Sequence, residues 1–163
     1  MAVQMLYQWE LGGSPLPEIF RSFDLYQYGA ETASRKIERG SDDAFDLACR
    51  LVRGTVESRE EIDRQIAEQA ENWRIERMPN VDRNILRLAI YEYLSDPELP
   101  KVVAIDEAIE LAKKFGSEKS GKFVNGLLDP LLSSEPLAQA RRAGGFGASG
   151  VTATDGDGAG GVG

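Results

Sequence analysis

Apolar side chains recur at intervals of three and four residues through most of the chain. This spacing places them on one stripe of a helix, whereas half-buried strands show alternation of apolar and polar residues. We therefore predict an all-α fold, a compact bundle whose Tyr28–Gly40 stretch is loop or weak helix. The expected helices are residues 2–11, a second after Pro17, 41–56, 58–70, about 80–94, 102–115, and a last one from Ser117 or Ser120 to 132.

Several residues have the properties expected at helix ends. Gly12-Gly13 is typical of a helix stop, and Ser41 is a candidate cap for the third helix. Ser58 and Glu61 form an S-x-x-E capping box, which predicts the start of the fourth helix. Pro130 lies late in the last helix and predicts a kink or early fraying there.

The same pattern suggests how the chain is organised. We expect a helical domain over residues 1–133, made of an N-terminal subdomain, 1–57, and a C-terminal subdomain, 58–133, that meet at the capping box. Residues 134–163 are rich in glycine and poor in branched apolar side chains. Such a segment buries too little surface to offset the entropy of ordering its backbone, so we predict a disordered tail.

The composition excludes several classes of enzyme. The 163 residues include no histidine and one cysteine, which rules out Cys/His zinc sites, Ser-His-Asp triads and histidine bases. The cysteine, Cys49, lies beside an apolar stripe and is expected to be a buried filler. Neighbouring carboxylates such as Glu60 and Glu61 point about 100° apart on a helix and do not converge. We expect a protein that is not an enzyme and that needs no cofactor or metal.

Membrane and secretion signals are missing from the sequence. It has no run of about 18 apolar residues and no basic-then-apolar segment at its start. We therefore expect a protein of the reducing cytoplasm that does not bind a membrane.

The net charge of −8 excludes general binding of polyanions. Contact with RNA would need a local cluster of cations, and residues 113–126 hold four lysines and two phenylalanines. Helix N-terminal amides there could bind phosphate, and a ring could stack on a base. The alternative is that the lysines complement the dipole of a helix C-terminus and that Phe123 belongs to the core.

Four stretches of the chain resemble the NusB family of bacterial transcription antitermination factors. The most specific are VVAIDEAIELAKKFG at residues 102–116 and KFVNGLLD at 122–129; VDRNILRLAIYE at 81–92 and AVQMLYQWE at 2–10 extend the similarity over residues 1–132. The resemblance implies an all-α fold of two helical subdomains, in agreement with the helices predicted above. It also implies binding rather than catalysis.

The resemblance implies both partners and site residues. NusB-like proteins pair with NusE, a small-subunit ribosomal protein, bind boxA RNA, and join the antitermination complex on RNA polymerase, especially in ribosomal RNA operons. Positions implied near the RNA are Lys122, Phe123 and Asn125, with Lys119 and Gln4 as neighbours, and positions implied on the NusE side are Tyr7 and Asp82. Each residue also has a structural alternative: Tyr7 could cover the core, Asp82 could be a first-turn acid, and Asn125 could bond only to backbone.

One departure from the family concerns the N-terminus. Relatives carry an Arg-rich segment before the first helix, whereas no lysine or arginine precedes Arg21 here. Since Met1 enters the helical pattern without a cap, we expect the natural chain to begin about ten residues earlier with basic residues. Mass spectrometry of the natural N-terminus tests this expectation.

Two other functions are open at this point. A NusB-like domain also forms the N-terminal part of some ribosomal RNA cytosine methyltransferases, but residues 134–163 are too few for a catalytic domain. The second alternative is a helical scaffold that forms a homodimer and does not bind RNA.

Overall fold

The computed structural model describes residues 1–31, 40–70 and 73–145. These residues form helices and no strand, which confirms the all-α fold. The helices are α1 (Ala2–Gly12), α2 (Leu16–Glu31), α3 (Gly40–Glu57), α4 (Arg59–Gln69), the short 3₁₀ helix η1 (Ile75–Arg77), α5 (Asn80–Ser95), α6 (Lys101–Phe115), α7 (Ser120–Leu132) and α8 (Glu135–Arg142).

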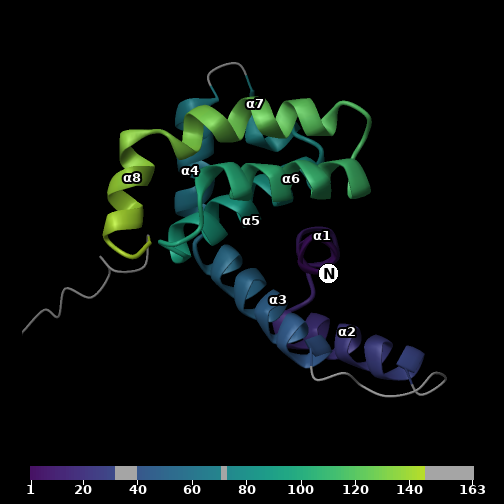
Figure 1. Ribbon diagram of the computed structural model, residues 1–163. Coiled ribbons are helices and arrows are strands. Elements are labelled where there is room, and N and C mark those ends of the chain that lie inside the picture. The colour runs from purple at the N-terminus through teal and green to yellow at the C-terminus, as the bar shows by residue number, and fades with distance from the viewer. Residues whose placement is uncertain (32–39, 71–72, 146–163) are drawn as a thin grey trace, which may run out of the picture.

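Helix α5 lies at the centre of the molecule. It packs against α1, α3, α4, α6, α7 and α8, and one cluster of buried apolar side chains runs from Val3 of α1 to Leu137 of α8. Figure 1 shows α6 and α7 side by side, while α2 and α3 extend together away from them. The turn between α6 and α7 is therefore at an end of this helix pair.

The predicted bounds of the helices are close to the observed ones, with three differences. Helix α3 begins at Gly40, so Ser41 lies inside the helix and the prediction that it caps the helix is wrong. Helix α1 ends as predicted, because Gly13 adopts a left-handed conformation (φ 65°) and its N–H donates to the Trp9 carbonyl at 3.2 Å. Helix α2 extends to Glu31, into the stretch expected to be loop or weak helix, and the rest of that stretch up to residue 39 lies outside the described residues. Helix α7 continues through Pro130 to Leu132, so the early fraying predicted there is wrong.

The capping box predicted at the start of α4 is also wrong. Ser58 occupies the N-cap position, but its side chain makes no capping hydrogen bond and its backbone (φ −95°, ψ 6°) is not extended. The Glu61 carboxylate instead accepts hydrogen bonds from Arg64, one turn along the same helix. A helix boundary does lie at the predicted division, since α3 ends at Glu57, but the two subdomains themselves stay a prediction.

The prediction that disorder begins at residue 134 is wrong for its first part. Residues 135–142 form α8, with Pro136 in its first turn, where proline is well tolerated. Leu137 is fully buried, and the Arg141 guanidinium donates to the carbonyl oxygens of Asp96 and Leu99 at 2.8 and 2.5 Å. The burial of Leu137 and the hydrogen bonds of Arg141 therefore stabilise this segment. Residues 146–163 lie outside the described part of the chain.

Candidate nucleic-acid interface

A tight turn joins α6 to α7 and sets the position of the lysines that follow. A Cβ atom at Gly116 would collide with the Ser120 side chain and the carbonyl oxygen of Ala112, so only glycine fits there. The N–H of Ser117 donates to Ser120 Oγ at 2.9 Å, and Ser120 is buried. This closed turn holds Lys119 directly before the first turn of α7.

Three of the residues implied to contact RNA are exposed on α7. Lys119 is at the N-cap, and Lys122 and Asn125 follow at intervals of three residues, which place neighbours on one side of a helix. Within the described residues, neither Lys119 nor Lys122 forms an ion pair. Both ammonium groups therefore remain available to phosphate oxygens.

Phe123 is half-buried. This exposure is intermediate between a core residue and a ring that is free to stack on a base. Its ring packs edge to face against Trp73, with 5.1 Å between the ring centroids and 77° between the ring planes. Trp73 is 56% exposed and lies between α4 and η1. The sequence argument missed Trp73, although an aromatic residue next to arginine in a short stretch between two helices was a usable signal.

Gln4 is exposed on α1, apart from the α7 group. The start of α1 lies near Lys114 of α6. Burial, followed by the charge of Lys114, therefore lowers the pKa of the Met1 amino group. The structure therefore brings Lys119, Lys122 and Asn125 together with Phe123 on α7, and it places Gln4 on another helix.

The two residues implied to face a protein partner differ in exposure. Tyr7 of α1 is 44% exposed, whereas Asp82 in the first turn of α5 is only 4% exposed. The Oδ1 atom of Asp82 is buried and accepts no hydrogen bond from the described residues. Tyr7 is thus accessible to a partner, whereas most of Asp82 is buried.

A network of charged side chains that the sequence argument missed holds α1 against α5. The Glu10 carboxylate accepts from Asn84 Nδ2 at 2.7 Å and Arg87 Nη1 at 3.0 Å, and lies 2.5 Å from Arg83 Nη2. Arg87 also donates to both Asp63 oxygens, at 2.7 and 2.9 Å. Burial raises the pKa of Glu10, but the hydrogen bond from Arg83 and the charge of Arg87 outweigh it and lower the pKa overall. This network fixes the helix that carries both Gln4 and Tyr7.

Few side chains of the described residues could carry other chemistry. No group of three histidine, cysteine, aspartate or glutamate residues among them is arranged to hold a metal ion. The Cys49 thiol is half-buried, so the expectation of a buried filler is wrong. Burial followed by the charge of Asp46 raises its pKa, which disfavours the reactive thiolate. The helices in these ranges also lack a segment long and apolar enough to cross a membrane.

Comparisons with known proteins agree on one family. The NusB family model matches residues 1–133. Transcription antitermination protein NusB of Sorangium cellulosum is 43% identical over 133 residues, which cover 82% of this chain and 87% of that protein. Two solved structures are also similar, each with a TM-score of 0.66: NusB of T. maritima, 35% identical and matched over 85% of this chain and 92% of that one, and a complex of the antitermination factors NusB and NusE with dsRNA, 31% identical and matched over 81% and 90%. The chain belongs to the NusB family.

Proposed function

We propose that this protein is a transcription antitermination factor that binds boxA RNA as a heterodimer with NusE. It then joins the antitermination complex on RNA polymerase, especially on ribosomal RNA operons, and acts in the cytoplasm without catalysing a reaction. Support comes from the names of its relatives and from a similar complex that contains NusE and RNA. The observation that carries the proposal is a set of two exposed lysines, without an ion pair to any other described residue, beside an aromatic ring at the start of α7.

We assign the RNA contacts to side chains of α7 and α1. Lys119 and Lys122 bind phosphate oxygens, Phe123 offers its ring to a base, and Asn125 supplies hydrogen bonds to a base or a ribose. Gln4 contributes a further polar contact from α1, whose first residue lies near Lys114 of α6. The phosphate contacts supply most of the affinity, because they release counterions from the RNA.

We assign the NusE contact to the junction of α1 and α5. Tyr7 supplies exposed aromatic area, a common feature of protein interfaces. Asp82 precedes Arg83, which is ion-paired with Glu10 on the same helix as Tyr7. Tyr7 and Asp82 thus belong to neighbouring parts of one surface, and the aspartate is placed at its covered edge.

A titration of boxA RNA with and without NusE tests this function. We expect the heterodimer to bind, and the Lys122→Glu variant to bind about tenfold more weakly because a phosphate contact becomes a repulsion. Arg50→Glu is the matched control, since it reverses an exposed charge on α3. Circular dichroism should show the same helicity for all three proteins.

Other outcomes of this experiment would contradict the proposal. Absence of RNA binding both with and without NusE would refute it. A stable homodimer that ignores NusE would favour the scaffold alternative, and equal affinity of wild type and Lys122→Glu would remove Lys122 from the site.

A further inference from the structure

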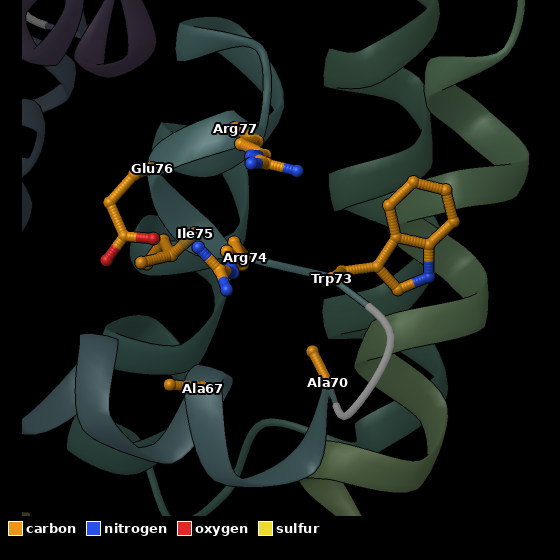
Figure 2. A pocket seen from close by; sticks show the side chains of 7 residues that line it. All are labelled: Ala67, Ala70, Trp73, Arg74, Ile75, Glu76 and Arg77. Atoms are coloured by element: carbon orange, nitrogen blue, oxygen red, sulfur yellow. The ribbon is translucent and has the colours of Figure 1, made fainter.

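A pocket of about 520 Å³ lies next to the α7 surface, where α4 ends and η1 begins. Its volume is within the range of about 300 to 1,000 Å³ that is usual for ligand sites. Figure 2 shows the side chains that line it, which are Ala67, Ala70, Trp73, Arg74, Ile75, Glu76 and Arg77. Because Trp73 touches Phe123, this pocket continues directly from the proposed RNA surface.

The charge of the lining favours an anion. Arg74 and Arg77 are exposed, and neither side chain has a hydrogen bond or an ion pair with another described residue. In Figure 2, Arg77 extends toward the side where Trp73 lies, while the Glu76 carboxylate points away from it. Arg77 therefore faces the side of the pocket where Trp73 lies, and among the described residues the Glu76 carboxylate forms no ion pair with Arg74 or Arg77.

The aromatic group of the lining favours a base. Trp73 is 56% exposed even though the Phe123 ring packs against it, so much of the indole surface remains uncovered. Bases stack on such exposed rings in proteins that bind single strands, and this stacking adds to the affinity. A base in an A-form duplex is already stacked inside the helix and is not available to a side chain in this way.

We propose that this pocket is a second nucleotide site, which binds an unpaired nucleotide of single-stranded RNA adjacent to the nucleotides held at Lys122 and Phe123. Trp73 stacks on the base, and Arg74 and Arg77 bind its phosphate group. The inference rests on the proposed function, and it predicts that the RNA footprint extends beyond α7. An acidic peptide segment would satisfy the arginines but would not need a ring beside the RNA surface.

The first test compares two RNAs in the complex with NusE: boxA RNA, and boxA RNA extended at either end by a short run of unpaired uridines. We expect an extension at one end to raise the affinity of the wild type about tenfold. The double variant Arg74→Gln/Arg77→Gln should lose this gain and keep the affinity for unextended RNA. The matched control Arg21→Gln/Arg50→Gln removes two exposed arginines of α2 and α3, and it should keep the gain.

The second test uses fluorescence and does not depend on the arginine variants. The chain has two tryptophans, so Trp9→Phe leaves Trp73 as the only one. We expect the extended RNA to quench Trp73 fluorescence more strongly than the unextended RNA does, because its extra base stacks on the indole.

Three results would overturn the inference. These are equal affinity of the wild type for both RNAs, an equal loss for both RNAs in Arg74→Gln/Arg77→Gln, and loss of NusE binding in that variant, which would assign the pocket to a protein contact. In each of them the unextended RNA is still bound by wild type, so the proposed function would survive. Failure of wild type to bind even the unextended RNA would refute both.

Discussion

Glu10, Asp63 and Arg87 are charged residues that the fold removes largely from water. Arg87 is 4% exposed and lies within the most buried helix, where an unpaired guanidinium would be costly. The geometry compensates, because Asp63 binds it through two parallel hydrogen bonds and Glu10 adds a third. These residues connect α1, α4 and α5, so the position of α1 depends on them.

Asp63→Ala should lower the free energy of unfolding by about 3 kcal/mol. It leaves the buried Arg87 guanidinium without the carboxylate that accepts two of its hydrogen bonds. The control is Glu68→Ala on the same helix, which removes an exposed ion pair with Arg64 and should have little effect on stability. Urea denaturation measures both. Equal costs for the two variants would show that the pair of Arg87 and Asp63 does not hold α4 against α5.

Glu92→Gln should stabilise the protein near neutral pH. Burial, followed by the charge of Glu107 and a hydrogen bond to it, raises the pKa of Glu92 from 4.5 to about 7. The folded state therefore holds this proton more tightly than the unfolded state, and stability is lost as the pH rises from about 4.5 through 7. Glutamine does not ionise, so the variant does not lose stability over this pH range.

Thermal unfolding at two pH values measures the effect of Glu92→Gln. Its Tm should exceed that of wild type at about pH 8, and the difference should shrink at about pH 5. Glu98→Gln removes an exposed carboxylate and controls for the change in net charge. A difference in Tm that is independent of pH would contradict the raised pKa.

Some of the site residues could be predicted from sequence and others could not. Lys119 and Lys122 were recognisable because lysines cluster there in an otherwise acidic chain. Trp73 had only the weaker signal of an aromatic residue next to an arginine, since its contact with Phe123 joins residues far apart in sequence. The low exposure of Asp82 was equally hidden, because a first-turn acid is usually solvated and only the packing around α5 covers this one.

At the scale of elements, α8 is the part of the fold that composition concealed. Glycines dominate the chain after residue 143, and they made the whole of 134–163 resemble a tail. The structure shows that one turn of helix around Leu137 is enough to reach the core, and Arg141 stacks on Tyr93 with its guanidinium carbon 3.7 Å from the ring centroid. Helix α8 therefore packs against the segment that connects α5 to α6.

Leu137→Ala should lower the free energy of unfolding by about 2 to 5 kcal/mol, because it removes a fully buried side chain. Gln139→Ala on the exposed side of the same helix is the control and should change stability by less than about 0.5 kcal/mol. Urea denaturation compares them. If Leu137→Ala is as stable as the control, α8 is not docked as described.

Helix bounds were easier to predict than helix caps. The periods of α5, α6 and α7 are long and regular, so their apolar faces fix the elements within a residue or two. A capping box is a local pattern with competing partners. Glu61 could bond back to Ser58 or forward to Arg64, and the strong guanidinium hydrogen bond prevails.

At the scale of the whole molecule, an acidic protein carries a small cationic surface. The net charge of −8 repels RNA over most of the molecule and limits binding to the place where lysines are concentrated. The rigid turn at Gly116 and the single core behind α7 keep that surface in one geometry. Under the proposed function, NusE is expected to supply the remaining affinity for the RNA.

The salt dependence of boxA RNA binding by the NusE complex tests this account most directly. For wild type and the Lys119→Gln/Lys122→Gln variant, the logarithm of the binding constant is plotted against the logarithm of the salt concentration. The account predicts a slope that is shallower by about 1.4 in the variant, since about 0.7 is lost for each phosphate contact to a single strand. An unchanged slope and affinity would show that the start of α7 does not hold the RNA.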